Sequence, residues 1–157
     1  MAGFPPIEEL LPHRGAMLLL DSVVSADERS IVANATVREA AWYLDEQGGM
    51  PAWIGIELMA QAIAAHAGLR GRVSGKPPKR GVLLGCRAYR ARVSRAPAGA
   101  VLKVSAKMTL VDESGFGAYD CMIEHGAAEF AAATLKVFVP EDFEAFTNQQ
   151  ATPGGGS

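Results

Sequence analysis

Cysteine is scarce in this chain, and no charge-free apolar run is long enough to cross a membrane. Only Cys86 and Cys121 occur among 157 residues. Inside strand-like segments they are expected to be buried free thiols, with a disulfide as the alternative. The longest apolar segment, Trp53–Leu69, is interrupted by Glu57, whereas a span needs about 18–20 apolar residues. Because the N-terminus also lacks an export signal, the sequence predicts a cytoplasmic protein with no membrane partner.

Several site-forming motifs are also missing. Three scattered His and two lone Cys give no zinc-ligand spacing. There is no phosphate-binding glycine loop and no Gly-x-Ser-x-Gly nucleophile motif. The sequence pI of about 5.9 is unlike that of a dedicated nucleic-acid binder. We therefore expect no metal, no cofactor and no nucleic-acid partner.

Two neighbouring segments have unusual polar content. Trp53–Leu69 carries only three polar side chains: Glu57, Gln61 and His66. Directly after it, the stretch from Arg70 to Arg95 holds nine of the fifteen Lys and Arg residues and no acidic one, although the net charge of the chain is −2. A lone carboxylate in an apolar helix costs free energy unless it has a partner or a function. Together the two segments indicate an apolar catalytic slot whose substrate arrives on an anionic carrier.

Hydrophobic periodicity predicts the order of the elements. We expect one domain over residues 1–145, with a flexible tail over residues 146–157. The expected elements are a helical turn at Ile7–Leu11, a fully buried strand at Ala16–Val24, a second strand at Arg29–Val37, a helix at Trp53–Leu69 ended by Gly68 and Gly71, and strands at residues 82–93, 101–111, 116–124 and 128–139.

The central helix is apolar nearly all round, so other elements must cover it on most sides. A curved antiparallel sheet of five to six strands wrapped around one long central helix satisfies both this requirement and the strand count. The predicted class is therefore α+β, in the hotdog arrangement.

Several motifs carry a resemblance to a known family. Leu11–Arg14 and Met17–Asp21, Met50–Pro51 followed by Gly55–Gln61, and the pattern from Leu84 to Leu102 resemble the 3-hydroxyacyl-[acyl carrier protein] dehydratases of bacterial fatty-acid synthesis. The similarity covers roughly residues 7–140. Variant subunits associated with aryl-polyene pigment clusters are the most similar subset, so fatty-acid or polyene biosynthesis is the implied context.

The resemblance implies conversion of a 3-hydroxyacyl thioester on acyl carrier protein to the trans-2-enoyl thioester. In that family, a loop His of one subunit meets the helix Glu of the other. Glu57 matches that Glu, but Tyr43 occupies the His position. We therefore expect Glu57 to act as the acid in a composite active site, with the base His from a partner subunit. The chain is expected to form a homodimer, or a heterodimer with a second hotdog subunit. Tyr43 is a catalytic candidate of its own chain.

Four further residues are candidates for binding the substrate, which the phosphopantetheine of the carrier would deliver. Gln61 lies one turn from Glu57 and could orient its carboxyl or contact the pantetheine arm. The alternative is that Gln61 is only a buried hydrogen-bond partner. Ala52 stands where the family has a Gly whose backbone N–H binds the thioester oxygen, and Trp53 follows it. The resemblance makes His13 a structural feature of its motif, with contact to the site as the alternative.

Three basic residues are candidates for binding the carrier protein. Alternation places Arg90 and Arg92 on one strand face and Arg87 on the other. An acid-free basic stretch can steer an acidic carrier, and a solvated sheet face is the alternative.

Three other functions remain open. The chain could be a self-sufficient dehydratase in which Tyr43, Asp45 or His13 acts as the base. It could be a non-catalytic partner or scaffold that binds carrier-linked acyl chains. It could also be a hotdog acyl thioesterase that uses the carboxylate as base or nucleophile.

Overall fold

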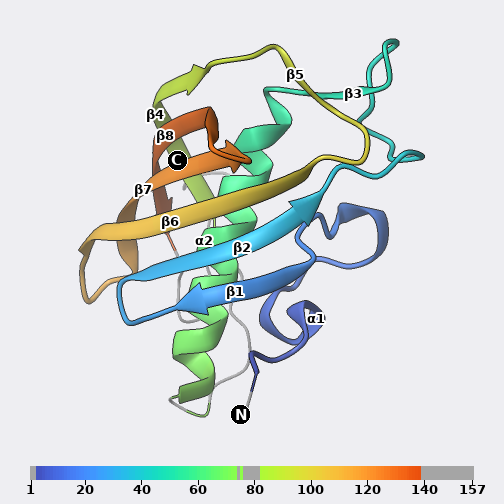
Figure 1. Ribbon diagram of the computed structural model, residues 1–157. Helices are drawn as coiled ribbons and strands as arrows, with labels where there is room; N and C mark the ends of the chain where they lie inside the picture. Colours follow the sequence, from blue (N-terminus) through green and yellow to red (C-terminus); the bar gives the residue numbers. More distant parts are fainter. Residues whose placement is uncertain (1–2, 74, 76–81, 139–157) are drawn as a thin grey trace, which may run out of the picture.

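The computed structural model describes residues 3–73, 75 and 82–138. In this part of the chain, a six-stranded antiparallel sheet curves around one long helix (Figure 1). This arrangement confirms the predicted α+β hotdog class. The elements are α1 (Ile7–Leu10), the 3₁₀ turn η1 (Gly15–Met17), β1 (Ser22–Ala26), β2 (Ser30–Thr36), β3 (Gly49–Pro51), α2 (Ile54–Val73), β4 (Val82–Ala91), β5 (Arg95–Pro97), β6 (Val101–Val111), β7 (Phe116–His125) and β8 (Ala128–Phe138).

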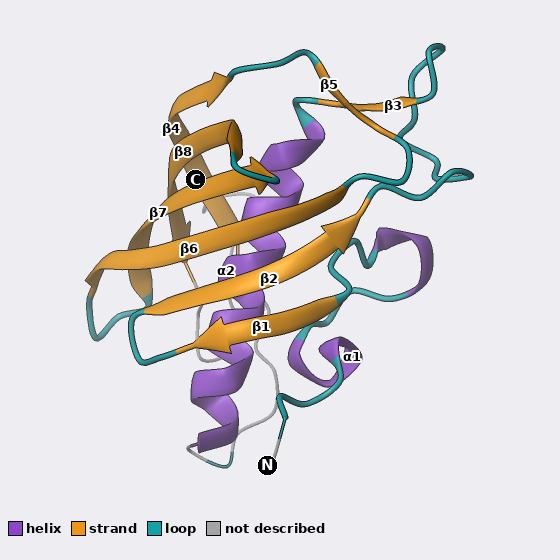
Figure 2. Ribbon diagram, in the orientation of Figure 1, coloured by secondary structure: helices purple, strands orange, loops and turns teal. Residues whose placement is uncertain are grey.

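The strand order of the main sheet is β1-β2-β6-β7-β8-β4, so β1 and β4 are its edges. Figure 2 shows the sheet crossing one side of α2, with the small β3–β5 ladder near the N-terminal end of that helix. The first two strands form a hairpin, in which β1 pairs antiparallel with β2. The short strands β3 and β5 were not predicted from the sequence, since three residues are too few to show a period.

Strand alternation decides which side chains pack on α2. In β2, the buried side chains are Ile31, Ala33 and Ala35, and the residues between them are half-buried. β6, β7 and β8 show the same alternation. Their inward-facing side chains therefore form one continuous core against the helix.

Helix α2 extends four residues beyond its predicted end, through two glycines that were expected to stop it. Gly68 lies where α1 crosses the helix, and a Cβ at this position would collide with the carbonyl oxygen of Leu10. Gly68 is thus a close-approach residue inside the helix and not a C-terminal signal.

The prediction of a buried central strand at Ala16–Val24 was wrong. The segment begins with η1, where Gly15 adopts a positive φ of 61°. Leu18, Leu19 and Leu20 are buried against the core without belonging to a strand. The strand starts only at Ser22 and lies at the edge of the sheet. The apolar run reflects burial, which periodicity alone does not distinguish from a central strand.

The predicted tail, residues 146–157, lies outside the described residues, and the domain boundary at residue 145 stays a prediction. Cys86 and Cys121 are both free thiols. Burial raises the pKa of the Cys121 thiol to about 12. No helix in the described part of the chain is long and apolar enough to span a membrane.

A buried histidine ties the C-terminal half of α2 to the sheet. His66 is fully buried, and its Nε2 lies 2.9 Å from the carbonyl oxygen of Asp27. Because a carbonyl only accepts, Nε2 carries the proton, and Nδ1 accepts from the Tyr119 hydroxyl at 3.3 Å. This neutral tautomer fits a pKa that burial holds below its ordinary value of 6.5. His66 is thus a buried hydrogen-bond partner of the sheet.

This histidine should make the protein less stable in mild acid. Its folded-state pKa is depressed, so its contribution to stability is complete above about pH 6.5 and decreases as the pH falls below that value. The limiting slope for one proton is about 1.4 kcal/mol per pH unit. We expect urea unfolding between pH 7.5 and 5 to show this decline, and His66→Gln to reduce it. The matched control His125→Gln changes an exposed histidine and should leave the slope unchanged.

Candidate active site

Glu57 lies in the first turn of α2, with its carboxylate at the surface of this single chain. Its side chain is 39% exposed, so the predicted deep burial is not present within one subunit. Oε1 accepts a hydrogen bond from Gln61 Nε2 at 3.0 Å and lies 3.4 Å from His13 Nε2. The carboxylate is therefore held from two sides and remains accessible from a third.

Gln61 is fully buried, and its amide group has a partner in every direction. Its Nε2 donates to the carbonyl oxygen of Met17 at 2.7 Å and to Glu57. Its Oε1 accepts from the backbone N–H groups of Leu19 at 2.9 Å and Leu20 at 3.4 Å. Of the two roles considered for Gln61, orienting the carboxyl is the one its contacts fit. Its amide has no position left for a pantetheine arm.

His13 reaches the carboxylate, which makes it part of the site. The residue follows α1 in the chain, and its side chain is 27% exposed. The next residue, Arg14, donates from one guanidinium nitrogen to the carbonyl oxygens of Leu11 at 2.6 Å and His13 at 2.7 Å, which fixes the backbone here. Among the described residues, buried His13 Nδ1 has no hydrogen-bond partner. The sequence offered only one signal for this contact, the Leu-Pro-His-Arg motif itself.

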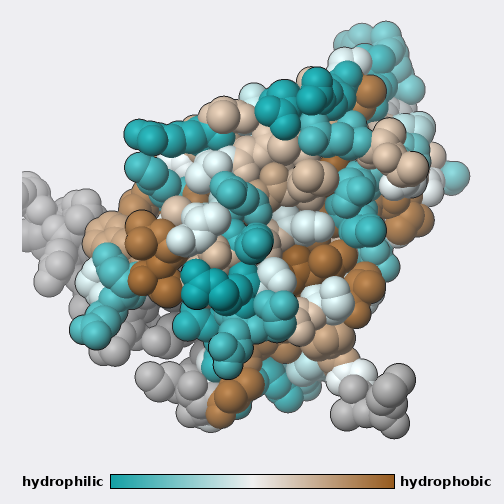
Figure 3. Space-filling view, turned by 60° about the vertical axis from the view of Figure 1, so that its left-hand side comes forward, coloured by the Kyte–Doolittle hydropathy of each residue, from teal (hydrophilic) through white to brown (hydrophobic). Residues whose placement is uncertain are grey.

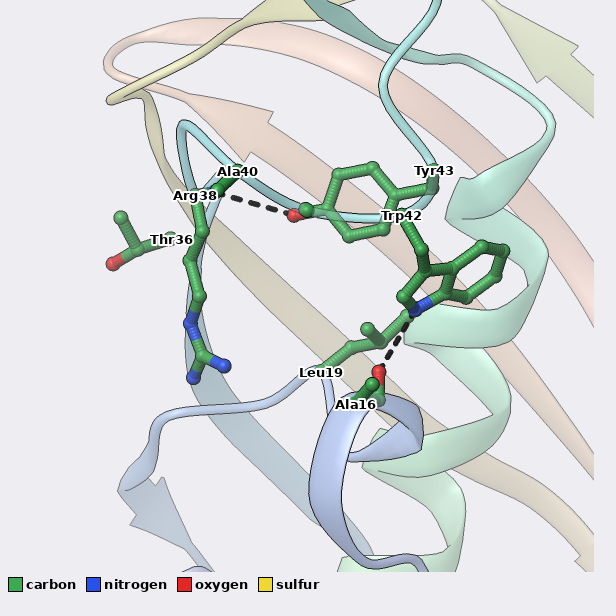
Figure 4. A pocket seen from close by; sticks show the side chains of 8 residues that line it. Ala16, Leu19, Thr36, Arg38, Ala40, Trp42 and Tyr43 are labelled. Carbon is green, nitrogen blue, oxygen red and sulfur yellow. Dashed lines mark hydrogen bonds between the residues drawn. The ribbon is translucent and has the colours of Figure 1, made fainter.

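Tyr43, the residue at the position of the family's His, points into its own subunit. It is buried, and its hydroxyl accepts the backbone N–H of Arg38 at 3.3 Å. Beside it, the indole Nε1 of Trp42 donates to the carbonyl oxygen of Ala16 at 2.8 Å (Figure 4). These residues line a pocket of about 340 Å³, together with Leu19, Thr36, Ala40 and Ala41. Among the described residues, no hydrogen bond connects Tyr43 with Glu57.

The same loop is closed further along by Asp45. Its carboxylate accepts from Arg95 Nε at 2.7 Å and from the backbone N–H groups of Gln47 and Gly49 at 2.9 and 3.1 Å. The hydrogen bond from Arg95 is the main cause that lowers the pKa of Asp45. A carboxylate held in this way is a poor proton acceptor, so Asp45 is a weak candidate for the base.

Ala52 does not offer the free backbone N–H that the family comparison implied. Its N–H donates to the carbonyl oxygen of Ser94 at 3.0 Å, because Ala52 continues the antiparallel β3–β5 pairing by one position. Its carbonyl oxygen accepts from the Tyr89 hydroxyl. The Ala52 N–H is therefore used within the chain in this conformation, and its binding of the thioester oxygen stays a prediction. Trp53, next in the chain, is 63% exposed at the entrance to α2.

The basic side chains are partly neutralised by acids from distant parts of the sequence. Glu129 of β8 lies 2.9 Å from Arg92 Nε and 3.6 Å from Arg90 Nε. These two arginines lie on one face, as predicted, and Glu129 compensates part of their charge. Glu9 pairs in the same way with Arg72 at 3.2 Å. Lys76, Lys79 and Arg80 are outside the described residues.

Arg87 differs from these arginines. It is exposed, and the described part of the chain provides no ion pair for it. It precedes a bulge in β4 at which Ala88 has a φ of 55°. Figure 3, turned so that the β4 side comes forward, shows hydrophobic groups separated by hydrophilic ones on this face. Arg87 is therefore the candidate carrier contact whose charge is least compensated.

The arrangement as a whole is suited to proton transfer. A carboxylate, a buried amide and an imidazole meet at the N-terminal end of α2. The carboxyl can donate or accept a proton, and the amide fixes its direction. Within residues 3–73, 75 and 82–138, no three His, Cys, Asp or Glu side chains gather as a metal site requires.

Comparison with known proteins identifies the family. The ApeP-like family model, described as ApeP dehydratase, matches residues 5–148. A chain in the dehydratase heterocomplex ApeI:P from Xenorhabdus doucetiae is 28% identical with a TM-score of 0.86, and the match covers 93% of this chain and 98% of that chain. No significant match was found among curated proteins.

More distant structures show the fold alone. A hypothetical thioesterase with coenzyme A from Streptococcus pneumoniae TIGR4 has a TM-score of 0.60 at 15% identity, with 75% of this chain and 84% of that chain covered. The E. coli PaaI protein has a TM-score of 0.59 at 20% identity, with 74% and 80% covered. The resemblance to hotdog dehydratases drawn from the sequence is confirmed, and the match is consistent with a variant subunit of the aryl-polyene type. The chain belongs to the ApeP-like family of dehydratases.

Proposed function

We propose that this chain is the Glu-bearing subunit of a dehydratase that converts a 3-hydroxyacyl thioester on acyl carrier protein to the trans-2-enoyl thioester. The observation that carries the proposal is the Glu57 carboxylate, held by Gln61 at 3.0 Å and half-open to a ligand. Membership of a dehydratase family supports the reaction class. The carrier-bound substrate, with no cofactor, is an inference from the sequence resemblance.

The reaction needs two proton-transfer groups. A base removes the C2 proton, the electron pair of that C–H bond forms the C2=C3 double bond, and the C3–O bond breaks. Glu57 in its protonated form donates a proton to the departing hydroxyl, which leaves as water. Deprotonated Glu57 and the protonated base then exchange protons with solvent to restore the starting state. Gln61 holds the carboxyl in one orientation throughout.

We further propose that the base is a His of a second hotdog subunit. The loop that carries this His in the resembling family is folded onto its own chain here, through Tyr43 and Asp45. Neither Tyr43 nor Asp45 is free to act as a base for a neighbouring site. The heterocomplex formed by the 28% identical relative supports a partner of the same fold.

Two surfaces of this chain are suited to such a partner. α2 has a half-buried apolar stripe that its own sheet does not cover, at three- and four-residue spacing: Ile56, Ala60, Ala64 and Ala67. β4 is an edge strand, with Leu83 and Leu84 exposed at 42% and 49%. Exposed strand edges with apolar side chains pair readily with another chain. A partner that covers both surfaces would also reduce the exposure of Glu57.

One observation favours a second candidate, a self-sufficient dehydratase. His13 Nε2 is 3.4 Å from Glu57 Oε1, so an imidazole of the same chain already stands beside the acid. In that mechanism His13 would take the C2 proton. Tyr43 and Asp45 are disfavoured as bases by their own hydrogen bonds.

A reconstitution assay separates these functions. The isolated chain, and the chain combined with a hotdog subunit that carries the loop His, are each given a 3-hydroxyacyl carrier substrate. We expect the mixture to form enoyl thioester at least about 100-fold faster, the usual minimum for a general base. Equal rates, with His13→Gln abolishing both, would establish the self-sufficient enzyme. Release of free acid would instead indicate a thioesterase.

Loss of the Arg87 charge should weaken recognition of the carrier. We expect Arg87→Ala to raise KM for a carrier-linked substrate about three- to tenfold, with kcat within about twofold, because an exposed charge mainly affects encounter. KM for a pantetheine thioester should not change. Arg72→Ala, which removes an arginine paired with Glu9 near the other end of α2, is the control. An equal rise in KM for both substrates would contradict a carrier contact.

A further inference from the structure

The hydrogen bonds around Glu57 continue past Gln61 to the loop that lacks the family's His. Trp42 Nε1 donates to the carbonyl oxygen of Ala16 at 2.8 Å (Figure 4). The next carbonyl along η1, that of Met17, accepts from Gln61 Nε2 at 2.7 Å. The same amide nitrogen donates to Glu57 at 3.0 Å. Trp42 and Gln61 therefore donate hydrogen bonds to two adjacent carbonyl groups of one short turn.

This turn has little support of its own. η1 is three residues long and begins at Gly15, and its backbone hydrogen bonds are Met17 N to Arg14 O at 3.2 Å and Leu18 N to Gly15 O at 3.1 Å. Short 3₁₀ turns have poor hydrogen-bond geometry and depend on outside contacts. The placement of η1 is therefore set by the side chains that bind its carbonyl groups.

Trp42 is arranged to act through its hydrogen bond. Its side chain is 51% exposed, so burial contributes little to fixing the indole. The neighbouring ring of Tyr43 is buried and meets the indole edge-on, with centroids 5.6 Å apart and planes at 75°. Tyr43 anchors this part of the loop, and the Trp42 N–H connects it to η1.

We propose that Trp42 is a positioning residue for Glu57. By holding the Ala16 carbonyl, it keeps η1 where Gln61 can bind both Met17 O and Leu19 N–H, so that the remaining N–H of Gln61 points at the carboxylate. The loop thus orients the acid of its own subunit in place of supplying a base. This role rests on the proposed function, since it requires Glu57 to react.

The test is Trp42→Phe, which keeps an aromatic ring and removes the N–H. Hydrogen–deuterium exchange of the Leu19 and Leu20 amides, which donate to Gln61, should become about tenfold faster in the full-length assembled protein. In the dehydration assay, kcat should fall about fivefold with KM within twofold. The control Thr109→Val removes another side-chain bond to a carbonyl, far from the site, and should change neither quantity.

Unchanged exchange at Leu19 and Leu20 in Trp42→Phe would overturn the proposal, because a packing role alone is met by phenylalanine. Faster exchange with unchanged kcat would overturn it as well, since η1 would then not determine the orientation of the carboxyl. Failure of the proposed function has a different signature, an unchanged rate in Glu57→Gln. The exchange measurement is independent of that result.

Discussion

Replacement of Glu57 by glutamine should lower kcat of the assembled dehydratase about 1000-fold, with KM within about threefold. Loss of a general acid costs about 10²- to 10⁴-fold in rate. The amide has nearly the size of the carboxyl and can still accept the hydrogen bond from Gln61 Nε2. The substitution therefore removes the transferable proton and leaves the geometry of the site in place.

A control variant and a stability measurement show whether the fall in kcat is due to loss of the acid itself. Glu113→Gln removes a carboxylate from the exposed β6–β7 turn and should leave kcat unchanged. The unfolding free energy of Glu57→Gln should remain within about 0.5 kcal/mol of the original, as is usual for half-exposed positions. A Glu57→Gln complex that turns over at the original rate would favour the non-catalytic partner.

The elements with a strong local pattern could be predicted from the sequence. β6 was predicted at residues 101–111 and is observed at Val101–Val111, because its alternating side chains bury one face from Leu102 to Met108. The start of α2 and the position of Glu57 in its first turn also follow from sequence, since Pro51 and an alanine-rich run mark a helix start.

The errors occurred where long-range contacts decide the conformation. The segment Leu18–Leu20 does not form a central strand, because buried Gln61 supplies the acceptor for two of its N–H groups from 41 and 42 residues away. Part of the basic stretch is compensated, because Glu129 approaches Arg90 and Arg92 through the β4–β8 pairing. Neither contact leaves a signal in the local sequence.

In the candidate site too, the contact between sequence neighbours could be predicted and the long-range contacts could not. Glu57 and Gln61 are neighbours on one helix, so their contact was expected from the four-residue spacing. The contact between His13 and Glu57 joins segments 44 residues apart in the sequence and depends on how the chain crosses α2 after α1. The hydrogen bond of the Ala52 N–H likewise depends on Ser94, which the fold brings to it.

Replacement of Gln61 by leucine should be the most destabilising single substitution in the site, with a loss of about 3–5 kcal/mol in unfolding free energy. The side chain is fully buried, and leucine would leave the Met17 carbonyl and the N–H groups of Leu19 and Leu20 without partners. Each unsatisfied buried group costs about 1–3 kcal/mol. Urea unfolding at neutral pH measures the effect, and Gln47→Leu in the exposed loop is the control.

The size of this loss bears on how the Glu57 carboxyl is held. A domain of this kind has about 5–15 kcal/mol of total stability, so a 3–5 kcal/mol contribution means that the amide orienting Glu57 is also a main link between α2 and the segment after η1. The carboxyl then cannot lose its orientation without partial loss of the fold. A loss below about 1 kcal/mol would contradict this coupling, because it would show that other groups satisfy the three backbone atoms once Gln61 is gone.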